Sequence, residues 1–257
     1  MISAREKWDR RKAVLANPYS PGAKANGGPP LILRDAIDRD GFAIIPNVLP
    51  SGEVEQILEQ ICASAPRRTR AGVRHALRLG PVSQVAQQPN LIQLAQVVLG
   101  PEAFPFRATL FDKSPRSNWL VVWHQDTALP LRERHQVLGW GPWSVKDGVH
   151  YAHAPRAALS QVLALRIHLD RSTTLNGPLR VLPGTQALGV LDDDRIHELS
   201  TTIDPVECLV SAGGILAMRP LLIHSSSKSQ AEADRRVLHI EYAASSSIAA
   251  PLNLAIT

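Results

Sequence analysis

The feature that most constrains the fold of this chain is a change of hydrophobic period near Phe106. Upstream of it, apolar residues recur at helical spacing in residues 31–40, 51–64 and 90–99. Downstream, short β-branched or alternating segments predict strands at residues 107–113, 119–124, 163–169, 178–182, 215–218, 221–224 and 237–243. Helices followed by strands predict a mainly β jelly-roll barrel with helices packed on its outer face.

The ends of several elements are also marked in the sequence. Ser51 is the expected N-cap of the second helix, and Gly100 followed by Pro101 is expected to end the third. Residues 41–46 predict a short strand between the first two helices.

Two stretches have no apolar periodicity. Residues 17–30 are rich in Pro, Gly, Ala and Asn, which predicts a surface loop or a disordered arm. We therefore expect residues 1–30 to form an N-terminal arm and residues 31–257 a single domain. Residues 127–155 predict a long ordered loop, which in a β fold usually has a function.

Composition narrows the functional classes. The 28 Lys and Arg against 23 Asp and Glu leave a net charge of +5, a mild excess that favours small anions and argues against a nucleic-acid partner. Cys62 and Cys208 are too few for a disulfide framework, so a reducing cytoplasm is expected. No apolar run approaches the roughly 20 residues that span a bilayer, so no membrane partner is expected. Composition predicts no oligomeric state.

Three residues predict a metal site. His124 and Asp126 lie two positions apart where a predicted strand ends, so their side chains emerge on one face. His224 ends another apolar segment 100 residues later and is the expected third ligand. Two imidazoles and one carboxylate suit iron(II) and leave positions for a chelating co-substrate and O2.

An arginine pair, Arg235-Arg236, follows His224 and opens a predicted strand, and a 2-oxoglutarate site needs such a cation. A guanidinium can hold the far carboxylate of 2-oxoglutarate with two parallel hydrogen bonds. Arg235 shares a face with His239, whereas Arg236 shares an apolar face with Leu238, which is expected to pack against the helices. We therefore expect Arg235 to bind 2-oxoglutarate, with Arg236 as the alternative.

Several segments resemble the phytanoyl-CoA dioxygenase (PhyH) family, which includes ectoine hydroxylase. The resemblance covers residues 40–244 and is carried by five motifs: Asp40-Gly-Phe42, Trp123-His-Gln-Asp126, Trp143-Ser-Val-Lys-Asp-Gly148, Asn176-Gly-Pro-Leu-Arg-Val-Leu-Pro-Gly184, and His224 with Arg235. It implies a double-stranded β-helix, cupin-like in shape. It also implies an Fe(II)-dependent dioxygenase that converts 2-oxoglutarate and O2 to succinate and CO2 while hydroxylating a small molecule.

The resemblance also suggests roles for two further residues. Trp143 corresponds to a ring that packs near the co-substrate, and Ser226 to a serine that bonds its carboxylate. Lys113, on the strand before the triplet, either reaches a carboxylate of the co-substrate or substrate or is an exposed strand-end lysine. An inward Arg166 would meet a substrate carboxylate or form a structural salt bridge. No site for coenzyme A is evident, which makes a thioester substrate doubtful.

Other uses of the same barrel make different demands on the sequence. A non-catalytic cupin-like protein that binds a metal or a small ligand would not require Arg235. Nucleic-acid demethylases of this type typically carry a second arginine on the last strand, where this chain has Glu241. Related halogenases replace the carboxylate ligand by a small residue, whereas Asp126 is present here. A hydroxylase is therefore the expected enzyme.

Overall fold

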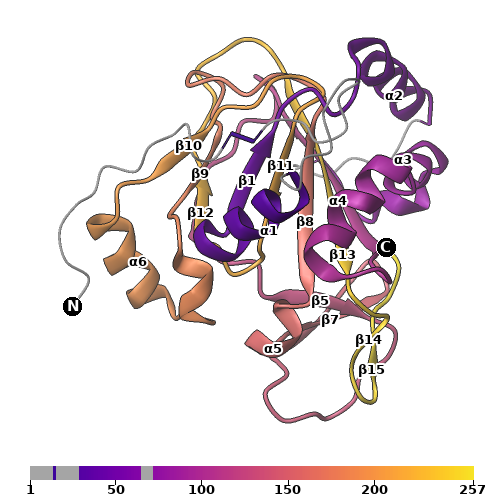
Figure 1. Ribbon diagram of the computed structural model, residues 1–257, viewed down its shortest axis with the longest axis vertical. Helices are drawn as coiled ribbons and strands as arrows, with labels where there is room; N and C mark the ends of the chain where they lie inside the picture. The colour runs from indigo at the N-terminus through magenta and orange to yellow at the C-terminus, as the bar shows by residue number, and fades with distance from the viewer. Residues whose placement is uncertain (1–13, 16–28, 65–71) are drawn as a thin grey trace.

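The computed structural model describes residues 14–15, 29–64 and 72–257 (Figure 1). Nearly all of the predicted N-terminal arm lies outside these residues. The division into an arm and a single domain stays a prediction.

The major sheet is antiparallel and is assembled from segments far apart in sequence. Its six strands run in the order β1-β11-β8-β13-β3-β2. They are β1 (Phe42–Ile45), β2 (Gly72–Val73), β3 (Phe104–Lys113), β8 (Val162–His168), β11 (Ile215–Met218) and β13 (Arg235–Ala243). Leu238 at the middle of β13 pairs with Leu110 of β3 and Ile167 of β8.

Alternation along these strands divides the major sheet into an outer and an inner face. Leu163, Leu165 and Ile167 of β8 and Leu238 and Ile240 of β13 belong to the core beneath the helices. The residues between them face the barrel interior. Polar side chains at inward positions are thus placed opposite the second sheet.

Helices cover the outer face of the major sheet (Figure 1). They are α1 (Pro29–Asp40), α2 (Ser51–Ala63), η2 (Ala76–Arg78), α3 (Gly80–Ala86) and α4 (Pro89–Leu99). The three predicted helices are confirmed, with bounds within two residues of those expected, whereas α3 and the short η2 were not predicted. Gly100 ends α4 as expected, with φ of 101°.

The minor sheet closes the barrel. Its strands run in the order β10-β9-β12-β4, with β4 (Val121–His124), β9 (Leu179–Val181), β10 (Val206–Cys208) and β12 (His224–Ser226). Phe42 and Leu216 from the major sheet share one core cluster with Leu179 and Val181 from the minor sheet. Beside the minor sheet lie η3 (Thr185–Leu188) and α6 (Asp193–Thr202). The predicted jelly roll with helices on the major sheet is confirmed.

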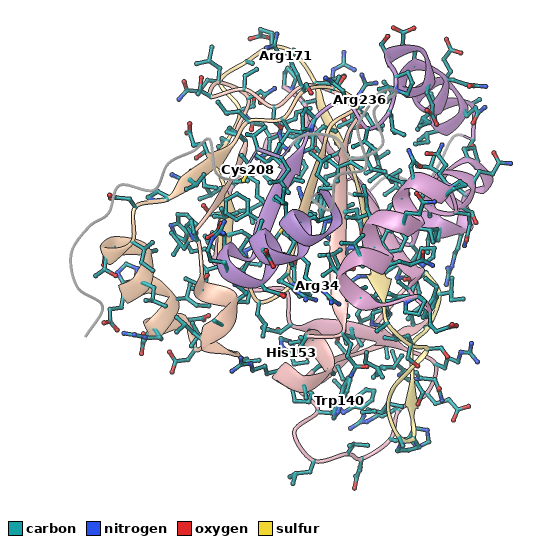
Figure 2. All side chains as sticks on the ribbon, in the orientation of Figure 1. Arg34, Trp140, His153, Arg171, Cys208 and Arg236 are labelled. Carbon is teal, nitrogen blue, oxygen red and sulfur yellow. The ribbon has the colours of Figure 1, made fainter. Side chains whose placement is uncertain are left out.

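The prediction of a loop at residues 127–155 is wrong, because this stretch contains a third sheet of order β5-β7-β6. Its strands are β5 (Ala128–Leu131), β6 (Trp143–Lys146) and β7 (Val149–His153). Asp147 and Gly148, with φ of 48° and 79°, form the tight turn between β6 and β7. This sheet lies at one end of the barrel with α5 (Arg156–Leu159) and the hairpin β14 (Ser247–Ala249) and β15 (Leu252–Asn253). Figure 2 labels Trp140 and His153 there.

Two smaller predictions are also wrong. Residues 221–223 form a turn rather than a strand; they are apolar because Leu222 and Ile223 are fully buried, and β12 begins only at His224. Ser51 is the first residue of α2, and the N-cap is Pro50, which offers no side-chain hydrogen bond.

Two other expectations concern disulfides and membranes. Both Cys62 and Cys208 are free thiols, the first exposed and the second buried. Among the described residues, the structure contains no helix that is both long and apolar enough to cross a bilayer.

Candidate metal and co-substrate site

A bulge at the end of β4 brings His124 to the inner face of the minor sheet. His124 pairs with His224 of β12, but Val121 pairs with Ser226, so β4 contains one more residue than β12 between these pairs. Both His124 and Val121 line the same cavity as a result. Strand alternation alone would have placed them on opposite faces.

Gln125 anchors the backbone between His124 and Asp126. Its buried amide donates to the carbonyl oxygens of Gly189 and Leu221, both at 2.8 Å, and accepts from the Leu191 amide at 2.9 Å. The three bonds hold together two loops and the end of β4, and they leave Asp126 directed toward the cavity. The position of the carboxylate therefore depends on a residue that itself faces away from it.

The three predicted metal ligands meet around one point. The Asp126 carboxylate oxygens lie 3.7 Å from His124 Nε2 and 3.6 Å from His224 Nε2, and the ligand atoms are all within 4.8 Å of one another. Each imidazole Nδ1 lies 2.8 Å from the carbonyl oxygen two residues earlier, Val122 or Leu222. A carbonyl can only accept, so Nδ1 carries the proton and Nε2 keeps a lone pair for a metal.

The surroundings keep His224 and Asp126 in the protonation states that a metal requires. Burial lowers the pKa of His224 to about 4, so its imidazole is neutral at physiological pH. Burial alone would raise the pKa of the Asp126 carboxyl, but His224, His124, His239 and Arg107 together outweigh burial and hold that pKa below its usual value. A neutral, oriented imidazole and a carboxylate are the donors that iron(II) accepts.

A second group of polar side chains lies beside the triad. Lys113 Nζ donates to Ser226 Oγ at 2.8 Å and to the Ser227 carbonyl at 2.6 Å. Arg235 Nε donates to the Asn176 carbonyl at 3.1 Å, and its Nη2 lies 3.5 Å from Ser226 Oγ. Lys113, Ser226 and Arg235 all line the cavity that contains the triad, which has a volume of about 100 Å³.

The Asn176-Gly177 turn supports this polar group. Ser226 Oγ donates to the Gly177 carbonyl at 2.8 Å. Gly177 has φ of 65°, and a Cβ there would lie 2.3 Å from the Ser227 carbonyl oxygen. Only glycine fits so close to β12 in this conformation, which explains in physical terms one motif that the sequence shares with the PhyH family.

The PhyH model matches the chain. The family model described as phytanoyl-CoA dioxygenase covers residues 37–237, well over half of the chain. This protein belongs to the phytanoyl-CoA dioxygenase family. It is an iron(II)- and 2-oxoglutarate-dependent dioxygenase, as the sequence resemblance implied.

Individual relatives agree with this assignment. The chain is 26% identical over 243 residues to an L-proline trans-4-hydroxylase of Streptomyces griseoviridis, covering 79% of this chain and 82% of the relative. The structure of EctD from S. alaskensis with bound Fe superposes with a TM-score of 0.59 at 18% identity, covering 82% of this chain and 75% of EctD. The epimerase SnoN, in complex with Fe3+, alpha ketoglutarate and nogalamycin RO, gives 0.63 at 18% identity, covering 83% of each chain. These structures share the jelly-roll fold.

The two adjacent arginines of this PhyH-family chain have separate environments. Arg236 faces away from the cavity, and its Nε and Nη2 bind the Asp170 carboxylate at 2.7 and 2.8 Å. Figure 2 labels Arg236 near the end of the barrel opposite Trp140. Arg235 is only 3% exposed and forms no ion pair with any described acidic residue. Of the two, only Arg235 can meet a ligand in the cavity.

Of two further predicted site residues, Lys113 lies in the cavity and Trp143 does not. Lys113 is 1% exposed, so it is not the exposed strand-end lysine that was the alternative. Trp143 lies partly exposed on β6, with the Arg134 guanidinium 5.8 Å from its ring centre, and it is not among the residues that line the cavity. Its role beside the co-substrate stays a prediction.

Three apolar residues that line the cavity were not predicted from the sequence. Phe111, Trp119 and Leu179 line the cavity, and the Lys113 ammonium lies 5.3 Å from the centre of the Trp119 ring. Two of these positions were recoverable, because Trp119 opened a predicted strand and Phe111 lies two residues before Lys113 on the same face of β3.

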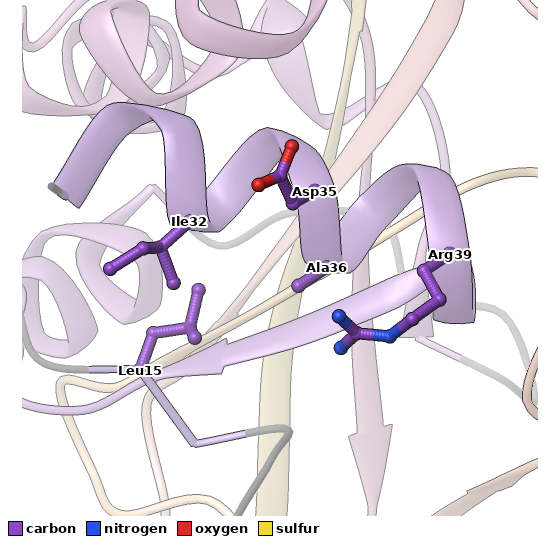
Figure 3. Close-up of a pocket in the computed structure, with 5 residues that line it drawn as sticks. All are labelled: Leu15, Ile32, Asp35, Ala36 and Arg39. Carbon is purple, nitrogen blue, oxygen red and sulfur yellow. The ribbon is translucent and has the colours of Figure 1, made fainter.

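A larger hollow elsewhere carries no comparable chemistry (Figure 3). It has a volume of about 430 Å³ and lies beside α1, where Leu15, Ile32 and Ala36 line it with Asp35 and Arg39. These side chains include one carboxylate and one guanidinium but no imidazole. The size of a cavity therefore does not identify the site in this protein.

Proposed function

We propose that His124, Asp126 and His224 hold iron(II) and that Arg235, Lys113 and Ser226 seat the far carboxylate of 2-oxoglutarate. The observation that carries this is the cavity in which the triad lies together with the buried cations Lys113 and Arg235. When bound, iron and its co-substrate supply the oxidation: substrate C–H, 2-oxoglutarate and O2 give C–OH, succinate and CO2. The chain's own residues bind and orient the reactants.

The non-catalytic cupin-like alternative is disfavoured. A protein that merely held a metal would have no use for Arg235 and Lys113, two cations buried beside the triad without an acidic partner among the described residues. Burying such charges is costly unless a ligand compensates them. A dicarboxylate co-substrate provides that compensation.

The substrate that we propose is a free small molecule, with amino acids as the first class to test. The similarity to an L-proline trans-4-hydroxylase supports this choice. The absence of an evident coenzyme A site in the sequence supports a free small molecule over a coenzyme A thioester. Turnover of 2-oxoglutarate to succinate with a panel of amino acids tests the proposal directly, and an absence of both turnover and 2-oxoglutarate binding would refute it.

Lys113 makes co-substrate affinity depend on pH. Burial, followed by the charges of Arg235 and Arg166, lowers the pKa of Lys113 to about 7. Lys113 is therefore charged below that pH and increasingly neutral above it, whereas Arg235 and Arg166 titrate only near pH 10. We expect the Kd for 2-oxoglutarate to rise about tenfold between pH 6.5 and 9 as one charge-assisted hydrogen bond is lost.

Anaerobic calorimetry with iron(II) across this pH range measures the effect. In Lys113→Met the Kd should be raised already at pH 6.5 and should then change little with pH. The exposed Lys228 provides the matched control, because Lys228→Met should keep the parental profile. A parental profile in Lys113→Met would remove Lys113 from the co-substrate seat.

A further inference from the structure

Arg166 is a buried cation in the cavity, and the proposed binding of the metal and the co-substrate does not use it. It lies on β8, is 6% exposed, and lines the cavity with Asp126, His124 and His224. No described acidic side chain forms an ion pair with it, and its Nε has no hydrogen-bond partner among the described residues. The structural salt bridge that was an alternative for an inward Arg166 is therefore not present.

A chain of contacts orients the Arg166 guanidinium. Arg166 Nη1 lies 2.9 Å from His239 Nδ1 on the neighbouring strand β13. A guanidinium only donates, so His239 Nδ1 accepts and its proton lies on Nε2. That Nε2 is 4.0 Å from the Glu241 carboxylate, which Arg107 holds in a two-point ion pair. The ring of Phe111 lies 5.2 Å from the guanidinium on another side.

The number of cations exceeds what 2-oxoglutarate requires. Lys113, Arg166 and Arg235 line the cavity, and Asp126 is its acidic lining residue. One carboxylate of 2-oxoglutarate chelates the metal in this class, and Arg235 with Lys113 accounts for the other. Burial lowers the pKa of Arg166 only to about 10, so it remains charged at neutral pH. One guanidinium is thus left facing the cavity without an ion pair to any described acidic side chain, with Asp126 as the nearby carboxylate.

We propose that Arg166 binds a carboxylate of the substrate and that His239 is the positioning residue that aims it. The inference rests on the proposed function, since it concerns the second ligand of the same cavity. The substrate class is then a small carboxylic acid whose carbon skeleton lies against the apolar wall of Phe111, Val121 and Leu179. A planar guanidinium matches the two oxygens of a carboxylate.

Pairs of acids and amides test the assignment. Succinate formation is measured with free L-amino acids, beginning with L-proline, and with their primary amides, which lack the charge. In the parent, an accepted acid should have a KM about 10- to 100-fold below that of its amide, as expected for a charge-assisted hydrogen bond. In Arg166→Gln the KM of the acid should rise to that of the amide, and the KM of the amide should change less than about twofold.

The control variant and the binding measurement separate this inference from the proposed function. Arg180 also has a buried Nε without a partner, but its guanidinium lies 5.2 Å from the Trp123 ring and does not line the cavity. Arg180→Gln should therefore keep the preference for acids. Anaerobic calorimetry should give Arg166→Gln a Kd for 2-oxoglutarate within about twofold of the parent.

Three results would overturn the inference while leaving the proposed function in place. The first is an Arg166→Gln variant that still prefers acids to amides. The second is a loss of 2-oxoglutarate affinity in Arg166→Gln as large as that in Arg235→Met, which would assign Arg166 to the co-substrate. The third is a parent that binds 2-oxoglutarate but neither binds nor responds to any acid of the panel. A parent that fails to bind 2-oxoglutarate refutes the proposed function itself.

The positioning role of His239 has its own signature. His239→Leu removes the acceptor and should raise the KM of the acid several-fold with little change in kcat. His239→Asn places an amide oxygen near the former Nδ1 and should restore most of the acid preference. Equal KM values for the acid in the Leu and Asn variants would show that His239 does not orient Arg166.

Discussion

Replacement of Asp126 by alanine is expected to lower succinate formation by at least about 100-fold. The loss of a metal ligand should lower activity more than the loss of a residue that only orients a ligand. Asp126 contributes the sole carboxylate to the described cluster of metal-ligating side chains. Two imidazoles alone bind iron(II) weakly, so the purified variant should also retain little iron. Turnover and iron content are measured together, in chloride-free buffer because related halogenases carry a small residue at this position.

His224→Ala should behave in the same way, since its Nε2 faces the same point from the opposite strand. The exposed His197 on α6 is the matched control, and His197→Ala should keep parental turnover. Circular dichroism and thermal unfolding establish that each variant is folded. A folded Asp126→Ala or His224→Ala protein with parental turnover and iron content would contradict the assignment of the metal site.

Arg235→Met is expected to raise the Kd for 2-oxoglutarate by about 100-fold, because two charge-assisted hydrogen bonds are lost from a buried position. Methionine keeps the aliphatic part of the side chain, so the packing of that part is largely preserved. Anaerobic calorimetry with iron(II) gives the affinity, and the iron content should remain that of the parent. Loss of co-substrate without loss of metal distinguishes this variant from the ligand variants.

Arg236→Met provides the control one residue away. Arg236 binds Asp170 outside the cavity, so its loss should lower the unfolding midpoint slightly and leave the Kd for 2-oxoglutarate unchanged. If instead Arg236→Met lost the co-substrate and Arg235→Met did not, the two arginines would have been assigned the wrong way round.

Much of the fold follows from local patterns in the chain. Helical spacing predicted α1, α2 and α4, and the shift to alternation predicted the long strands β3, β8 and β13. Alternation along β13 also separated Arg235 from Arg236, because the apolar face of that strand had to pack against helices. Each of these features depends on the spacing of apolar residues within one segment, and that spacing can be read without knowing which other segments it contacts.

The predictions were wrong where a segment is too short to show a period or where a turn is buried like a strand. The sheet formed by β5, β6 and β7 was taken for a loop because its strands have only four or five residues, too few to display a period. The Asp147-Gly148 turn was the available signal. Residues 221–223 were taken for a strand because burial in a turn and burial in a strand require the same apolar side chains.

By itself, the sequence determined the fold class and predicted the three candidate metal ligands and Arg235, since residue type and spacing express these directly. Tertiary structure alone decided that the bulge in β4 turns His124 toward His224 and that carbonyl oxygens direct both Nε2 atoms to Asp126. It also decided that Arg166 lines the cavity without an ion pair to any acidic residue in the described part of the chain. Each depends on contacts between strands distant in sequence, whose pairing no local pattern specifies.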